Sequence, residues 1–363
     1  MSTISLCMIV RNEEAVLERC LRSASPIADE IIIIDTGSTD RTKEIALGFT
    51  PKVFSFPWRD DFSAARNESF SKASMDYCMW LDADDVIPSG SLDSWLSLKR
   101  QLDRTSPPAD VVMAPYHAAF DQNDSPAFTY YRERLLRREG NFRWAGRVHE
   151  AIAPSGEILY TSAAVEHRKE KPGDPDRNLR IYREQLAQGE SLEPRQQFYY
   201  ARELLDHGEY AEAQKVLSQF LKEGKGWVEN NLDACRLLGR CLLAQGKEDE
   251  SLQALLWALS YAPPRAELCC DLGEHFFNRR RWKEAAFWYG RALEAERKEG
   301  AGAFMIEDCY EYLPCIQLCV CCYHLGNQIK AEEYNERAGK IKPDSEAFLY
   351  NRSFFAGLHT GNE

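Results

Sequence analysis

The chain has 363 residues, 44% of them hydrophobic, so it is long enough for two domains that each bury a core. A net charge of −12 argues against a protein that binds nucleic acids, because such binding depends on clustered Lys and Arg. Without a signal peptide or a run of about eighteen apolar residues for a transmembrane segment, the twelve cysteines indicate reduced thiols in a cytoplasmic protein.

The first part of the chain alternates short apolar runs with amphipathic stretches, which is typical of βαβ units and a parallel sheet. Strands are predicted at residues 4–10, 30–35 and 77–82, and helices at 14–24, 39–47 and 64–73. Each strand ends in charged or small polar residues. Because open α/β sheets bind ligands beyond the carboxyl ends of their strands, these residues are candidates for a binding site.

After residue 85 the pattern loosens into a mixed α+β continuation, with a helix at 91–102 and strand-like segments at 111–116, 128–138 and 141–152. The composition changes at residues 170–178, which are rich in Pro, Gly and charge. We therefore predict an α/β domain over residues 1–170, a linker or helix over 171–195, and an all-α domain over 196–363.

Four similar segments recur in this last part of the sequence. GEYAEA, GKEDES, RRWKEA and GNQIKA begin at Gly208, Gly246, Arg280 and Gly326, at spacings of 38, 34 and 46 residues. A spacing of 34 residues matches a tetratricopeptide unit, and the other two spacings require insertions. The alternative is an irregular helical bundle with accidental periodicity.

Two polar clusters follow the first two predicted strands. Arg11, Asn12 and Glu13 can hydrogen-bond a base or ribose, although Asn12 can equally cap the next helix and Glu13 can favour its dipole. In the second cluster a tight turn and helix capping explain Gly37 and Ser38, but not Asp35. The carboxylate of Asp35 can accept a hydrogen bond from a pyrimidine N–H.

Three carboxylates, those of Asp82, Asp84 and Asp85, crowd the end of the third strand. Like charges this close are costly unless a cation compensates them, so a divalent metal is favoured over a solvated acidic turn. On the preceding helix, the fork-shaped guanidinium of Arg66 suits a diphosphate, although it could also be a surface arginine.

The ordered motifs MIVRNEE, IIIDTGSTDRT, FSAARNES and WLDADD together resemble glycosyltransferase family 2, which has the GT-A fold. The resemblance covers residues 4–168, and its catalytic part also resembles the lipopolysaccharide core β-glucosyltransferases. With tetratricopeptide-like repeats at the end, the chain is similar to the sublancin-type peptide S-glycosyltransferases. The resemblance implies inverting transfer of a hexose or N-acetylhexosamine from a nucleotide sugar, commonly a UDP-sugar.

The family's site residues carry over motif by motif. The resemblance implies that the nucleoside is held by Arg11, Asn12, Glu13 and Asp35, the diphosphate by Arg66 and the ribose by Asp82. It implies that Mn²⁺ or Mg²⁺ is bound by Asp84, with His167 completing the metal site. The base that deprotonates the acceptor is expected to be Glu150 in the V-H-E segment, with His149 as the competing candidate.

The last part of the chain bears on the acceptor. Lipopolysaccharide-type relatives often end in membrane-associating helices, whereas this chain ends in acidic-leaning repeats. Tetratricopeptide arrays present grooves that commonly bind extended peptides. We therefore expect a peptide, protein or glycan acceptor, and a homodimer formed through the repeats.

Two rival functions also fit parts of the sequence. In the first, the protein is a non-catalytic scaffold that binds a nucleotide and uses its repeats to bind a protein partner. The second is a nucleotidyltransferase, which also uses paired carboxylates and a metal. It would be expected to carry a Gly-rich basic phosphate loop near the start, which RNEEAVLER lacks.

Overall fold

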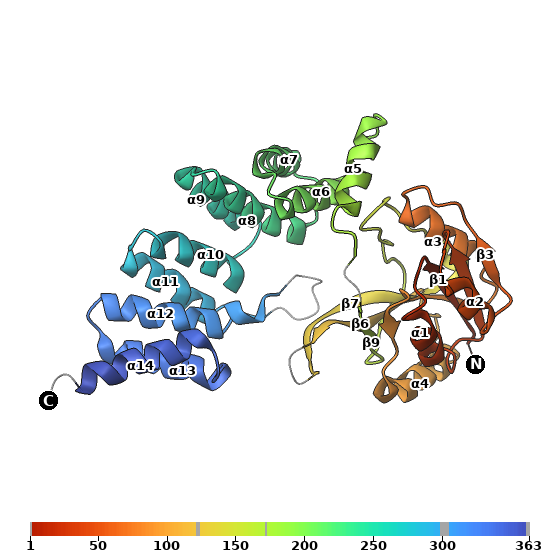
Figure 1. Ribbon diagram of the computed structural model, residues 1–363, viewed down its shortest axis with the longest axis horizontal. Helices are drawn as coiled ribbons and strands as arrows, with labels where there is room; N and C mark the ends of the chain where they lie inside the picture. Colours follow the sequence, from red (N-terminus) through yellow and green to blue (C-terminus); the bar gives the residue numbers. More distant parts are fainter. Residues whose placement is uncertain (1, 121–123, 171–172, 298–304, 361–363) are drawn as a thin grey trace. The chain divides into compact units, whose positions relative to one another are not determined.

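The computed structural model describes residues 2–120, 124–170, 173–297 and 305–360 (Figure 1). The chain divides into two compact units, residues 1–191 and residues 192–363. The first unit is built on a sheet and the second contains helices. In the described parts of both units, no helix is at once long enough and apolar enough to cross a membrane.

A nine-stranded mixed sheet forms the centre of the first unit, in the order β3-β2-β1-β4-β7-β6-β9-β5, with β8 also paired to β6. Its strands are β1 (Ile4–Val10), β2 (Glu30–Asp35), β3 (Val53–Ser55), β4 (Tyr77–Trp80), β5 (Asp85–Val86), β6 (Val111–Phe120), β7 (Pro126–Arg137), β8 (Ile158–Tyr160) and β9 (Val165–His167). Strands β3, β2, β1 and β4 are mutually parallel, and β7 joins antiparallel to β4. The carboxyl ends of the four parallel strands therefore meet at one edge.

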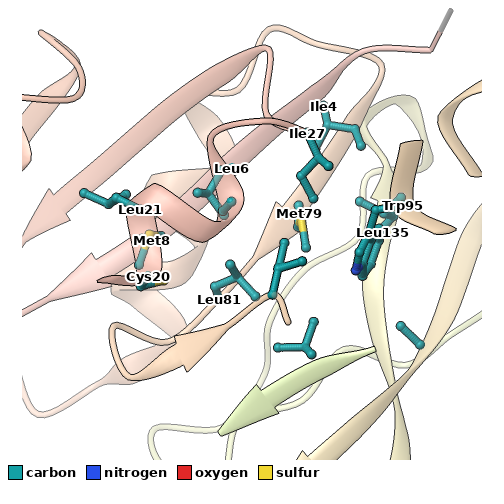
Figure 2. Packing of buried hydrophobic residues seen from close by; sticks show 14 of the residues in the cluster. Ile4, Leu6, Met8, Cys20, Leu21, Ile27, Met79, Leu81, Trp95 and Leu135 are labelled. Atoms are coloured by element: carbon teal, nitrogen blue, oxygen red, sulfur yellow. The ribbon is translucent and has the colours of Figure 1, made fainter. Parts of the chain in front are cut away.

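Helices cover both faces of this parallel part, which explains why the central strands β1, β2 and β4 are mostly apolar and buried. On one face, Leu6 and Met8 of β1 belong to a buried cluster that also contains Leu21 of α1 (Leu17–Ala24) and Trp95 of α4 (Leu92–Leu102) (Figure 2). On the other face, Cys7 of β1 lies in a cluster with residues of β2, β4 and α3 (Phe62–Ser71). The remaining helices of the unit are α2 (Thr42–Leu47) and α5 (Arg177–Ala187).

One predicted segment is wrong. Residues 141–152, expected to be strand-like, form no strand and make only an isolated bridge between Ala145 and Ala151. Gly146 and His149 have positive φ angles of 99° and 51°, which a β-strand cannot accommodate. The segment is therefore an irregular loop.

The second unit consists of helix pairs followed by a final helix. Its helices are α6 (Pro194–Asp206), α7 (Tyr210–Glu223), α8 (Val228–Ala244), α9 (Glu248–Trp257), α10 (Ala266–Phe277), α11 (Trp282–Leu293), α12 (Tyr312–His324), α13 (Gln328–Ile341) and α14 (Glu346–Thr360). The four similar sequence segments fall at the turn inside each pair. Residues Gly208, Gly246, Arg280 and Gly326 occupy these turns with φ angles of 74°, 74°, 56° and 79°. The sequence repeat is therefore a repeat of turn geometry.

Small residues allow the paired helices to approach closely. A Cβ added to Gly273 of α10 would lie 2.8 Å from the ring of Tyr289 in α11, and one added to Gly239 of α8 would lie 3.0 Å from Leu255 in α9. The cysteines also serve the packing, because all twelve are unpaired and buried.

Candidate functional site

The loops after β1 and β2 are joined by hydrogen bonds. The Asn12 side-chain oxygen accepts a hydrogen bond from the Thr39 backbone N–H at 2.8 Å, and the Asn12 backbone N–H donates to Ser38 Oγ at 3.0 Å. Asp35 is buried at the end of β2 and accepts a hydrogen bond from the Ser38 backbone at 3.0 Å. The structure therefore brings Asn12 and Asp35 together at this sheet edge, and part of their hydrogen-bonding capacity is used within the loops.

Arg11 and Glu13 flank Asn12 in the same loop. Arg11 is exposed, whereas the backbone N–H of Glu13, four residues before the start of α1, donates to Thr42 Oγ1 at 2.7 Å. Burial alone would raise the pKa of Asp60, but hydrogen bonds from Arg180 and Trp58 and the charge of Arg11 lower it. Arg11 is thus available at the surface of this edge.

Arg66 of α3 forms ion pairs with two other predicted site residues. Its Nε donates to Glu150 Oε1 at 2.6 Å, and its Nη2 donates to Asp82 Oδ1 at 2.7 Å. Burial favours the neutral acid, but the charge of Arg66 outweighs it and lowers the pKa of Asp82. Three predicted site residues from distant parts of the sequence are therefore in direct contact.

Asp84 and His167 form a second cluster, in which Asp85 takes part. His167 Nδ1 lies 3.4 Å from Asp84 Oδ1 and 3.4 Å from Asp85 Oδ1. Burial raises the pKa of Asp84. The charge of His167 opposes this shift, and the charges of Asp82 and Asp85 reinforce it. The hydrogen bond to Asp85 raises the pKa of His167 against the effect of burial. The cluster thus concentrates negative charge around one imidazole.

Asp85 is fully buried, and two of the residues that hold it, Tyr116 and Arg134, were not predicted from the sequence to belong to the site. Tyr116 Oη donates to its Oδ1 at 2.9 Å, and Arg134 Nη1 and the Asp82 backbone N–H each donate to its Oδ2 at 3.1 Å. Arg134 is itself fully buried, and its Cζ lies 3.8 Å from the centre of the Trp80 ring. The segment Arg132-Glu133-Arg134 could have pointed to Arg134, because a charged residue in a buried strand requires a partner.

The donor set fits a divalent cation. Within the described part of the chain, Asp84, Asp85 and His167 are the one group of three or more potential ligands, with ligand atoms within 4.8 Å of one another. Carboxylate oxygens and an imidazole suit Mn²⁺, and a cation would offset the charge that raises the pKa of Asp84. Hydrogen bonds already occupy both carboxylate oxygens of Asp85. The members of this group that retain capacity to bind a metal are therefore Asp84 and His167.

The structure separates His149 from Glu150. The ring of His149 stacks on Tyr182 of α5 with centroids 6.4 Å apart, and its Nε2 lies 3.5 Å from Asn178 Nδ2. The side chain of Glu150 points instead to Arg66. The two candidate bases thus face different surroundings.

Comparison with known proteins identifies two families along the chain. Residues 5–155 match Glycosyl transferase family 2, and residues 201–266 match the tetratricopeptide repeat. A TPR repeat-containing protein of Synechococcus elongatus is 38% identical over 43% of this chain and 36% of its own length. The SPbeta prophage-derived glycosyltransferase SunS of Bacillus subtilis is 28% identical over 58% of this chain and 51% of its own length.

A third relative is the lipopolysaccharide core biosynthesis glycosyltransferase LpsC of Rhizobium meliloti, 28% identical over 43% of this chain and 58% of its own length. The matched regions thus span less than two thirds of each of these relatives. The predicted resemblance and fold class are confirmed. The chain carries an N-terminal glycosyltransferase family 2 domain of α/β architecture, followed by a helical tetratricopeptide repeat domain.

Proposed function

We propose that this chain is an inverting glycosyltransferase that moves a hexose or N-acetylhexosamine from a UDP-sugar to a peptide, protein or glycan acceptor. One observation carries the proposal. The acidic turn after β4 places Asp84 beside His167 and connects Asp82 through Arg66 to Glu150, at the carboxyl edge of a family 2 sheet. The candidate metal ligands and the candidate base therefore both lie beside the turn of residues 82–84.

The donor is proposed to bind along this edge. Its nucleoside lies against Arg11, Asn12, Glu13 and Asp35 at the ends of β1 and β2, and its ribose is bound by Asp82. The proposal is supported by the parallel pairing of β2, β1 and β4, which brings the three strand ends to the same side of the sheet. Exposed Arg11 and the partly exposed carboxylate of Asp82 retain capacity for a ligand.

The chemical step is a direct displacement. Glu150 accepts the proton of the acceptor hydroxyl or thiol, the acceptor atom bonds to the anomeric carbon, and the bond to the nucleoside diphosphate breaks. Mn²⁺ or Mg²⁺ held by Asp84 and His167 would neutralise charge on the diphosphate leaving group. Glu150 is favoured over His149 as the base because the imidazole is turned toward α5.

The repeat domain is proposed to hold the acceptor. Paired helices with small residues at their contacts stack into arrays that bind extended peptides, which supports a peptide or protein acceptor. A homodimer through the repeats and a cytoplasmic location remain part of the proposal.

A donor screen tests the function. The protein is incubated with Mn²⁺ and individual UDP-, GDP- or dTDP-sugars, and nucleotide release is measured. Slow release from one donor should be lost in Asp84→Ala and retained in Asp93→Ala, which removes an exposed carboxylate from α4. Donor binding without release would favour the nucleotide-binding scaffold. The absence of both donor binding and nucleotide release would refute the proposal.

The acceptor is tested separately by intact-mass analysis of candidate peptides incubated with the active donor. A mass increase of one sugar per peptide is expected. Transfer only to glycans, with no modified peptide or protein, would refute the peptide-binding role of the repeats.

A further inference from the structure

The guanidinium of Arg66 is enclosed. Its Cζ lies 5.1 Å from the centre of the Trp80 ring and 4.8 Å from that of Trp144, and the two rings contact edge to face at 5.0 Å. Only 6% of the residue is exposed. The third nitrogen, Nη1, is also buried and makes no hydrogen bond within the described structure. The arginine is therefore part of an aromatic and ionic core, with little surface open to a ligand.

The two carboxylates that Arg66 binds belong to segments that no strand pairing connects. Asp82 follows β4, whereas Glu150 lies in the irregular segment 141–152. Because Nε and Nη2 are neighbouring nitrogens on one edge of the guanidinium, Glu150 Oε1 and Asp82 Oδ1 are held side by side. One side chain thus fixes the distance between the two segments.

The irregular segment is attached to α3 at other points as well. Asn67 exchanges two hydrogen bonds with the backbone of Trp144, at 2.9 Å and 3.0 Å. The Phe62 N–H donates to the Arg147 carbonyl at 2.8 Å. These backbone contacts hold the loop, but Arg66 is the contact that reaches the carboxylate of Glu150 itself.

We infer that Arg66 is a positioning residue that holds Glu150 in register with the Asp82-Ala83-Asp84 turn, and that it is not a ligand of the donor diphosphate. This inference depends on the proposed function, in which Glu150 is the base. Because Nη1 is enclosed, the guanidinium could reach a diphosphate only by turning away from its two carboxylates, of which Glu150 is 12% and Asp82 36% exposed. Such unpaired buried charges are strongly unfavourable.

Arg66→Lys tests the inference, because lysine keeps the charge but cannot offer two adjacent N–H groups in a fixed plane. With the donor found active for the wild-type protein, kcat should fall about 100-fold, as expected for a displaced catalytic group. The affinity for UDP and Mn²⁺, measured by calorimetry, should stay within about threefold of the wild type. A diphosphate ligand would give the opposite division, with at least about a tenfold loss of UDP affinity.

A double-mutant cycle separates positioning from a general loss of structure. If Arg66 acts through Glu150, Arg66→Lys should lower kcat little further in a Glu150→Gln background. Additive losses would overturn the inference. Lys99→Gln is the matched control, because Lys99 is also a buried cation paired with an aspartate, Asp29, but lies at the amino end of β1 and β2. It should leave kcat unchanged.

The two proposals fail in different ways. If the wild-type protein neither binds nor turns over any donor, the proposed function fails and the role of Arg66 fails with it. If the wild-type protein is active and Arg66→Lys weakens UDP binding or leaves kcat unchanged, only the positioning role fails.

Discussion

Asp84 and Asp85 are adjacent carboxylates in different surroundings, and we expect their amide variants to behave differently. Asp85 and Arg134 are both fully buried, and Asp85 accepts hydrogen bonds from Tyr116, Arg134 and the Asp82 backbone as well as from His167. Asp85→Asn leaves the charge of Arg134 uncompensated in the core, which costs about 3–5 kcal/mol. In a unit of this size, 1 kcal/mol corresponds to about 2–4 °C, so the melting temperature should fall by about 10 °C.

Asp84→Asn should cost less than about 1 kcal/mol, because Asp84 is partly exposed and burial and neighbouring negative charges already raise its pKa. It should instead weaken Mn²⁺ binding by at least about tenfold. Amide hydrogen exchange in β4 and β6 of the full chain measures the stability of the first unit separately from the repeats. Calorimetric titration measures Mn²⁺ binding.

A second substitution checks the electrostatic origin of the loss. Arg134→Met in the Asp85→Asn background removes the unpaired cation and should recover part of the stability. Equal destabilisation by Asp84→Asn and Asp85→Asn, or no loss in Asp85→Asn, would refute the division of the acidic turn into a structural and a metal-binding carboxylate.

Three further predictions concern stability. Burial alone would raise the pKa of Glu30, but hydrogen bonds from Lys52, Ser5 and Ser74 outweigh this effect and lower the pKa from 4.5 to about 2. Its stabilisation is therefore present above pH 4.5 and is lost as the pH falls toward 2, so Glu30→Gln should cost at most about 3 kcal/mol at pH 7 in urea unfolding and little at pH 2. Gly273→Ala should destabilise α10 and α11 by about 1–3 kcal/mol through contact with Tyr289, whereas Gly290→Ala, which meets no atom within 4 Å, should be neutral or stabilising by hydrogen exchange. Arg280 has a left-handed backbone conformation, which costs a non-glycine residue about 1 kcal/mol, so Arg280→Gly should raise the melting temperature. Gly246→Ala introduces the same strain and should lower the melting temperature.

Much of the fold can be predicted from the sequence because local patterns determine it. The strands β1, β2 and β4 and the helices beside them follow from apolar runs and amphipathic periodicity, and the repeats follow from their recurring turns. Residues 141–152 were predicted wrongly because a positive φ at His149 is imposed by tertiary contacts and leaves no trace in hydrophobic periodicity.

The candidate site is predictable only in part. The rule that ligands bind at the ends of parallel strands brings Asp35, Asp82 and Asp84 to one edge. The pairing of Arg66 with Glu150 joins residues 84 positions apart and depends on how the loop folds over the sheet. The distinction between Asp84 and Asp85 likewise depends on the β6–β7 register shift that leaves Arg134 outside the regular pairing.

The cysteines provide each unit with its own reporter of unfolding. Cys7, Cys20 and Cys78 lie in the first unit, and the other nine lie in the second. Because every thiol is buried, a labelling reagent reacts only when the surrounding structure opens. Mass spectrometry of a labelling time course therefore assigns each opening event to the first or the second unit, without any engineered probe.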